Sequence, residues 1–212
     1  MALVLFVSAG TLAWWQAWVL IVVLLVTRTV SAVIAHRVNP ALLRERAGLP
    51  LHGDQPWADR LLVLAVLGVG FLGITAVAAL DRFHWHVFPR PPLPLGGAGL
   101  VLFALGWGLK GWALRTNAFA TTVVRMQHER NHAVVVSGPY SVVRHPFYAA
   151  DPLIFLGLSL WLESYVATLF AIVPIALMMV RLTLEERFLR NALPDYREYA
   201  KRVRYRLVPG LW

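Results

Sequence analysis

The sequence predicts an all-α integral membrane protein with about five transmembrane helices, including a C-terminal helical hairpin, and a cytosolic helical tail. Of its 212 residues, 58% are hydrophobic and nine are tryptophan, and the mean hydropathy is +0.62. This composition is far from that of soluble globular proteins. In addition, apolar stretches recur at about the 20 residues that are needed to cross roughly 30 Å of hydrocarbon. The bilayer is therefore the expected solvent of this chain.

Three apolar stretches predict one transmembrane helix each: Leu3 to Thr27, Leu61 to Leu80 and Leu93 to Leu114. A fourth stretch, from Phe147 to Val180, is too long for a single helix, and polar residues at 163 and 164 interrupt it. We expect a tight hairpin of two helices there, which brings the expected number of spans to about five.

We expect one membrane domain over residues 1–212. Residues 1–114 hold the three N-terminal spans and an interfacial loop, in which a short helix is predicted at 41–48 between a proline and a glycine. Residues 115–212 hold the hairpin and the tail. The tail from Glu185 to Tyr205 is expected to form one or two helices, with a break at Pro194.

Glycines on the third span predict close packing against a neighbouring helix, since small residues let two backbones approach each other. They are Gly96, Gly97, Gly99, Gly106, Gly108 and Gly111.

The basic residues predict the orientation in the membrane. The formal net charge is +9, and the basic residues concentrate between Arg28 and Arg60, between Arg115 and Arg144, and from Arg181 onward. The positive-inside rule places these regions in the cytoplasm and the N-terminus outside. We expect a cell membrane of the bacterial inner-membrane type. The charge is thus explained by topology and attraction to membrane lipids, and we expect no nucleic-acid partner. The sequence does not predict the oligomeric state.

Two clusters of ionisable residues bracket the predicted hairpin. Residues 137–148 read Ser-Gly-Pro-Tyr-Ser-Val-Val-Arg-His-Pro-Phe-Tyr, and a second cluster extends from Arg181 to Arg187. Proline after His145 favours a helix start there, and the free N–H groups of a helix N-terminus suit an anion. The adjacent carboxylates of Glu185 and Glu186 suit a cation. A hairpin would bring the two clusters into one polar site at the membrane edge.

Each of these residues also has a structural interpretation that the sequence leaves open. Arg144 and His145 could be interfacial residues beside a span, and Glu185 and Glu186 could be the solvated start of the tail. Asp151 falls inside an apolar run, where an acid costs roughly 2.5 to 3.5 kcal/mol, so a partner or a water-filled cavity is expected. The candidate partners are Arg144 and Arg181. The chain has no cysteine, and no metal site is predicted.

The C-terminal half resembles the isoprenylcysteine carboxyl methyltransferase family, with its bacterial members and the related phospholipid methyltransferases. The resemblance is strong over Arg115 to Trp212 and weaker upstream. The matching motifs, in chain order, are Arg125-Met126-Gln127, His132, Gly138-Pro139-Tyr140, Arg144-His145-Pro146-x-Tyr148, Glu185-Glu186, Tyr196-x-x-Tyr199 and residues 202–210. One position departs from the family pattern: Ala150 stands where the family usually has glycine, which puts the detailed shape of the pocket in doubt.

The resemblance implies methyl transfer from S-adenosyl-L-methionine in a small helical membrane enzyme that has no Rossmann domain. The cofactor-binding candidates that it implies are His132, Val136, Gly138, Tyr140, His145, Pro146, Tyr148, Glu185 and Glu186. Arg181 matches a family arginine near the reacting group of the substrate, and Arg144 is the second catalytic candidate. The charges of the two clusters suit this cofactor, because it carries a sulfonium, an ammonium and a carboxylate.

The expected acceptor is a small amphipathic or lipid-like molecule that is methylated on a carboxylate, thiol, amine or hydroxyl. Two other functions stay open at this point. One is a membrane sterol- or enone-type reductase that uses a nicotinamide cofactor, against which the paired glutamates count, because carboxylates repel a nucleotide's phosphates. The other is a non-catalytic membrane scaffold.

Overall fold

The described part of the structure, a computed structural model, is all helical. It covers residues 1–38, 57–117, 134–193 and 195–212, and these residues contain no strand. The helix expected at 41–48 lies outside the described residues. Four helices are long and apolar enough to cross a membrane: Trp15–Ile34, Trp57–Trp85, Leu93–Thr116 and Tyr165–Ala192. The predicted all-α integral membrane fold is therefore confirmed.

The N-terminal span differs from the prediction. The expected helix from Leu3 to Thr27 is two helices, α1 (Ala2–Ala9) and α2 (Trp15–Val38). Gly10 ends α1 with a left-handed backbone, at φ 67°, which glycine adopts without steric cost. The predicted boundaries of the first span were wrong, because the turn carries no charged residue and Ser8, Gly10 and Thr11 were counted as part of the span.

The other two single spans are confirmed, with longer boundaries. The second begins as α4 (Trp57–Leu67) and continues through a π-helical segment, η1 (Gly68–Gly73), into α5 (Ile74–Leu80) and a second π-helical segment, η2 (Asp81–Trp85). The third is α6 (Leu93–Thr116).

The predicted hairpin is also confirmed. It consists of α7 (Pro146–Trp161), followed by α8 (Tyr165–Phe170) and α9 (Ile172–Ala192). The hydroxyl of Ser164 caps α8 by accepting from the backbone N–H of Ala167. Arg82 donates to the Glu163 carboxylate at 3.0 Å, so the polar residues that predicted the turn are paired at the far end of the bundle.

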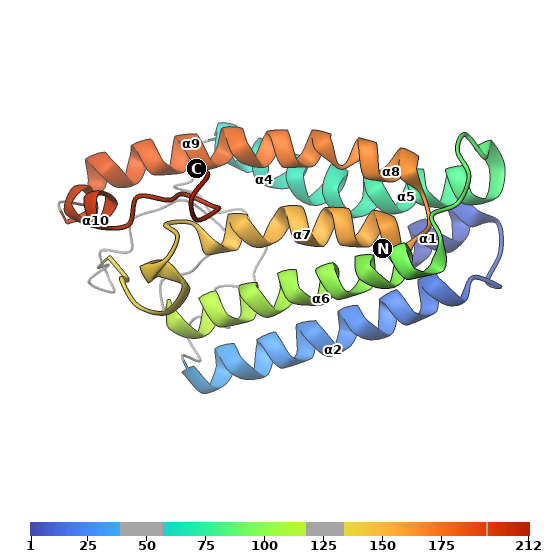
Figure 1. The fold of residues 1–212 in the computed structure, drawn as a ribbon, viewed down its shortest axis with the longest axis horizontal. Helices are drawn as coiled ribbons and strands as arrows, with labels where there is room; N and C mark the ends of the chain where they lie inside the picture. The colour runs from blue at the N-terminus through green and yellow to red at the C-terminus, as the bar shows by residue number, and fades with distance from the viewer. Residues whose placement is uncertain (39–56, 118–133, 194) are drawn as a thin grey trace.

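The fifth predicted span corresponds to α7, which has only 16 residues and is not among the four long apolar helices. It nevertheless runs alongside α6 through the middle of the bundle (Figure 1). Its length of about 24 Å, at 1.5 Å per residue, is slightly less than a typical hydrocarbon core. The chain thus passes along the bundle in α2, α4–α5, α6, α7 and α8–α9.

Small residues bring α6 and α7 into close contact, as predicted. A side chain at Gly99 would meet the backbone of α7 at 2.8 Å, and one at Gly157 would meet the backbone of α6 at 2.5 Å. Not every glycine takes part, because Gly97 and Gly108 face open space. The fully buried side chains of Phe103 and others fill the rest of this interface.

The tail folds back over one end of the bundle. Here α9 continues without interruption to Ala192, so the first part of the predicted tail belongs to the last span. A separate helix, α10 (Tyr196–Arg202), follows the predicted break, and residue 194 itself lies outside the described residues. Figure 1 shows α10, the C-terminus and the turn that leads into α7 gathered at the same end.

Candidate active site

The first predicted cluster forms a turn that leads directly into α7. A short 3-10 helix, η4 (Gly138–Ser141), is followed by His145 as the N-cap of α7 and Pro146 as its first residue, as the sequence predicted. Gly138 has φ +57°, and a side chain there would meet Thr116 of α6 at 2.6 Å. This turn therefore requires glycine for both its backbone and its packing.

The C-terminal segment is pinned to this helix start. The backbone N–H of Arg144 donates to the carbonyl of Tyr205 at 2.9 Å, and that of His145 donates to Arg206 at 3.0 Å. The guanidinium of Arg144 also donates to the carbonyls of Val203 and Arg204 at 2.8 and 2.9 Å. Arg144 thus holds the tail over the end of the hairpin.

Glu186 joins the two predicted clusters. Its carboxylate lies 2.9 Å from Arg144, 2.9 Å from Arg190 and 2.6 Å from Arg206. The Glu186 side chain is only 3% exposed. One buried carboxylate is therefore surrounded by three guanidinium groups, which leaves a surplus of positive charge at this point.

Two tyrosines of α10 complete the attachment of the tail. The hydroxyl of Tyr196 lies 3.2 Å from Nε2 of His145, and the hydroxyl of Tyr199 donates to the carbonyl of Tyr140 at 2.7 Å. Burial lowers the pKa of His145 below its ordinary value and raises the pKa of both tyrosine hydroxyls. His145 is therefore a neutral imidazole at neutral pH.

A second group of contacts lies deeper in the hairpin, around Tyr148. The Tyr148 hydroxyl donates to the Glu185 carboxylate at 2.5 Å, and the guanidinium of Arg181 lies 5.7 Å from the centre of the Tyr148 ring. Arg181 in turn donates to the Asp59 carboxylate of α4 at 2.8 Å. This places Arg181 and Glu185 on the face of α9 that is turned toward Tyr148.

Asp151 has a partner that differs from both candidates named from the sequence. Neither Arg144 nor Arg181 pairs with it: its carboxylate binds the ammonium of Lys110 on α6 at 2.5 Å. Arg144 is engaged by the tail and Glu186, and Arg181 by Asp59. The expected pairing was therefore wrong, although the expectation of a partner was correct.

Comparison with known proteins now adds to this geometry. Residues 96–195 match the model of the family described as Phospholipid methyltransferase. We call residues 96–195 the methyltransferase region because of this match. They include most of α6 and all of α7, α8 and α9.

Three relatives illustrate the similarity. The cobalt-zinc-cadmium resistance protein CzcN from Cupriavidus metallidurans is 36% identical over 97 residues, which cover 45% of each chain. The protein-S-isoprenylcysteine O-methyltransferase from Schizosaccharomyces pombe is 32% identical over 108 residues, 47% of this chain and 46% of that one. Protein-S-isoprenylcysteine O-methyltransferase B from Arabidopsis thaliana is 30% identical over 123 residues, 57% of this chain and 58% of that one.

The resemblance to the isoprenylcysteine carboxyl methyltransferase family is thereby confirmed. The chain spans about half the length of the relatives that it matches. The activity of this protein is therefore proposed from its own site.

Most of the predicted site residues lie together at one end of the methyltransferase region. They are Tyr140, Arg144, His145, Pro146, Tyr148, Arg181, Glu185 and Glu186. Gly138 lies in the turn beside them, and Val136 is 46% exposed on the segment that leads to it. His132 lies outside the described residues.

Sequence reasoning missed several ion-pair partners of Arg181 and Glu186. Asp59 comes from α4, and Arg190 and Arg206 come from the tail side of Glu186. Arg190 follows Glu186 by four residues, a helical spacing that predicts such a pair. Nothing in the sequence could have connected Asp59 with Arg181, because they lie 122 positions apart.

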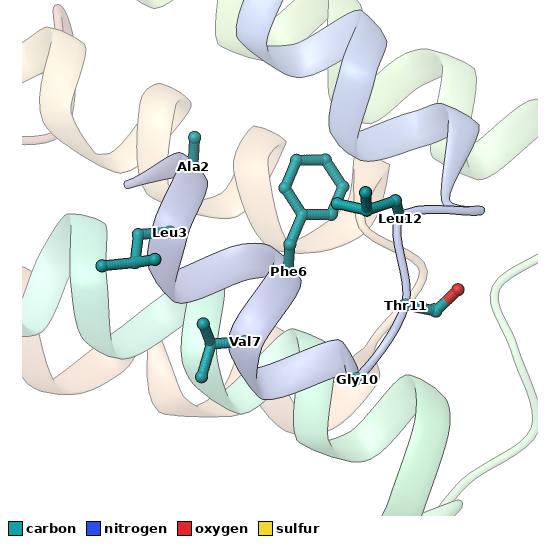
Figure 2. Close-up of a pocket in the computed structure, with 7 residues that line it drawn as sticks. All are labelled: Ala2, Leu3, Phe6, Val7, Gly10, Thr11 and Leu12. Atoms are coloured by element: carbon teal, nitrogen blue, oxygen red, sulfur yellow. The ribbon is translucent and has the colours of Figure 1, made fainter.

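A shallow apolar hollow lies elsewhere, on α1 and the turn after it. Figure 2 shows its lining, in which Phe6 and Leu12 face each other across the opening. It contains no charged residue and lies far along the bundle from α10 (Figure 1). It takes no part in the candidate active site.

Proposed function

We propose that this protein is a membrane methyltransferase that uses S-adenosyl-L-methionine and methylates an amphipathic, lipid-like acceptor. The observation that supports this most strongly is the meeting of Tyr148 and Glu185 beneath the tail that Arg144 pins down. It occurs inside the region that matches the methyltransferase family. The membrane helices supply the surroundings that a lipid-like acceptor needs.

The residues present fit the charges of this cofactor. Glu185 is half-buried and receives one hydrogen bond, from Tyr148, so it has acceptor capacity left for an ammonium group. The three guanidinium groups around Glu186 leave positive charge for a carboxylate. The buried Nε of Arg144 has no hydrogen-bond acceptor within the described ranges, which is the kind of donor that a bound anion satisfies.

The assignment of roles follows from these contacts. Glu185 would hold the positive end of the cofactor, the arginine side of the site would hold its carboxylate, and His145 and Pro146 would form the wall at the start of α7. When bound there, the cofactor supplies an electrophilic methyl group on a positively charged sulfur. Val136, Gly138 and Tyr140 remain proposed contacts on the turn before α7, and His132 remains a proposed contact upstream.

Arg181 is proposed to orient the acceptor. Its guanidinium is held by Asp59 and lies over the Tyr148 ring, so it is a fixed cation one helical turn from Glu185. A fixed cation positions an anionic group without acting as a base. Leu182, Met178 and Leu207 pack with Tyr148 into a buried apolar cluster, which limits water at the reaction site and favours reactions that neutralise charge.

The acceptor atom is a carboxylate, thiol, amine or hydroxyl, and the proposal does not depend on which. The relatives from Schizosaccharomyces pombe and Arabidopsis thaliana are named for isoprenylcysteine, which supports an acceptor with an apolar chain. We further propose that the site faces the cytoplasm of a bacterial-type cell membrane, on the side where the basic residues gather.

Calorimetry on the purified protein in detergent tests the proposal. S-adenosylhomocysteine should bind in the micromolar range that is common for cofactor sites, and NADPH should not bind. Binding of NADPH without binding of S-adenosylhomocysteine would replace this proposal with a reductase. Binding of neither ligand by folded protein would leave a scaffold without a cofactor.

A further inference from the structure

A second polar cluster lies between α2, α6 and α7. On α6, the Trp107 ring has the guanidinium of Arg28 at 5.6 Å and the ammonium of Lys110 at 5.9 Å from its centre. Lys110 in turn binds Asp151 of α7 at 2.5 Å. Three helices therefore contribute charged groups to one place, and the proposed methyl transfer uses none of them.

This cluster is distinct from the candidate active site. Asp151 lies about one helical turn beyond Tyr148 on α7, but it contacts α6, whereas Tyr148 contacts Glu185 of α9. The two groups therefore have different partner helices, α6 for Asp151 and α9 for Tyr148. A ligand at one of them does not have to be the reactant at the other.

The charges in this cluster do not balance. Two cations, Arg28 and Lys110, accompany the single carboxylate of Asp151, and Arg28 has no ion-pair partner among the described residues. The side chain of Trp107 adds a donor, because Trp107 is only 9% exposed and its Nε1–H has no acceptor in the described part of the chain. Arg28 is exposed and the Trp107 Nε1–H is buried, and one anionic group could satisfy both donors.

The surroundings of Arg28 are apolar. The neighbouring residues of α2 that are exposed on the outside of the bundle are Val22, Leu25, Val26, Val30 and Val33. On α6, Val101, Leu105 and Trp112 are also exposed. Since these faces belong to membrane helices, lipid chains cover them. A ligand of this cluster must then combine an anionic group with apolar chains.

We infer that Arg28, Lys110 and Trp107 form a binding site for the phosphate of an anionic phospholipid, with its acyl chains along α2 and α6. Basic pockets between transmembrane helices bind such headgroups. The phosphate would satisfy the Arg28 guanidinium and accept from the Trp107 Nε1–H, while Lys110 remains shared with Asp151. The lipid need not react, so this site goes beyond the proposed methyl transfer.

The test compares lipids by their effect on thermal unfolding of the protein in detergent. Phosphatidylglycerol should raise the Tm of the parent protein in a saturable way, and phosphatidylcholine should not. Arg28→Gln should need at least about tenfold more phosphatidylglycerol for half of the effect, as expected when a charge-assisted contact is lost. Arg115→Gln removes an equally exposed arginine near the end of α6 and should respond like the parent.

A second variant guards against loss of folding in the first. Trp107→Phe keeps an aromatic ring for the cations but loses the Nε1–H donor together with the five-membered ring of the indole, so it should show a weaker but measurable loss of phosphatidylglycerol affinity. Equal responses of the parent, Arg28→Gln and Trp107→Phe would overturn the inference. A parent that responds equally to phosphatidylcholine would also overturn it, and so would one stabilised as strongly by glycerol phosphate, which has no acyl chains.

Discussion

The guanidinium of Arg144 lies 2.9 Å from the carboxylate of Glu186, and both side chains are almost completely buried. This contact ties the start of α7 to the end of α9, because Arg144 precedes α7 and Glu186 lies in α9. The same arginine holds the tail through the carbonyls of Val203 and Arg204. The ion pair therefore connects the two helices of the hairpin with the tail.

Loss of the Glu186 charge should destabilise the protein. Glu186→Gln leaves three guanidinium groups without their carboxylate, and removing one partner of a buried ion pair typically costs about 3 to 5 kcal/mol. We expect a clearly lower Tm in detergent. Glu198→Gln is the control, since Glu198 forms an exposed pair with Lys201, and its Tm should match the parent. Equal Tm values for all three proteins would refute the structural role of Glu186.

Arg181 should separate acceptor chemistry from cofactor binding. Arg181→Lys keeps a positive charge but loses the planar guanidinium that Asp59 holds. We expect the affinity for S-adenosylhomocysteine to stay within a few-fold of the parent, while methyl transfer falls by roughly 10²-fold, the scale that misplacement alone produces. Binding and turnover are measured on the same preparation.

Asp59→Asn provides a matched control for this experiment, because it leaves Arg181 in place and weakens only its anchor. Like Arg181→Lys, Asp59→Asn should lower turnover, and it should leave cofactor affinity near the parent value. Equal loss of binding and turnover in Arg181→Lys would instead place Arg181 in the cofactor site or in the fold.

The buried imidazole of His145 should make stability depend on pH. Burial lowers the pKa of His145, although the nearby carboxylates of Glu185 and Glu186 act to raise it. The guanidinium groups of Arg144 and Arg206 also lower this pKa, and the Tyr196 hydroxyl faces the imidazole. The unfolded chain then binds a proton at higher pH than the folded chain. The free energy of unfolding should therefore fall as the pH drops below about 6.5, and this contribution ends below the folded-state pKa.

The pH dependence of Tm in the parent and in His145→Gln measures this effect. Above about pH 6.5 the two curves should be parallel, and below it the parent should lose stability faster. Parallel curves over the whole range would show that His145 contributes nothing to the pH dependence.

Orientation is tested with topology reporters. The distribution of basic residues predicts that a reporter fused after Trp212 scores cytoplasmic and that one inserted near Pro91 scores periplasmic. In Figure 1 the C-terminus lies at the same end as α10 and the start of α7. A periplasmic score after Trp212 would contradict a cytoplasmic cofactor site.

Composition and apolar length predicted the membrane fold and the hairpin, because these depend on hydrophobic content and on the places where polar residues interrupt it. The turn at Gly10 was missed because no charged residue marks it, and the small residues Ser8, Gly10 and Thr11 are also tolerated inside membrane spans. Conversely, the break at residues 163 and 164 was predicted because polar residues there interrupt the apolar run.

The site could be predicted only in its local parts. The helix start at Pro146 follows from proline chemistry. Which cation meets which carboxylate depends on how helices pack, and hydropathy does not encode this. Lys110 lies inside a span, and its ion pair with Asp151 was not predicted. Glu185 and Glu186 looked equivalent in the sequence, but only Glu186 is enclosed by arginines.

This difference between the two glutamates gives the most direct test of cofactor binding at this site. Calorimetry with S-adenosylhomocysteine is run on the parent and on Glu185→Gln. The account predicts micromolar binding to the parent and at least about tenfold weaker binding to Glu185→Gln, since a lost charge-assisted contact costs roughly 1.5 to 3 kcal/mol. The Tm of Glu185→Gln should stay near that of the parent. Folded Glu185→Gln that binds S-adenosylhomocysteine as tightly as the parent would contradict the account.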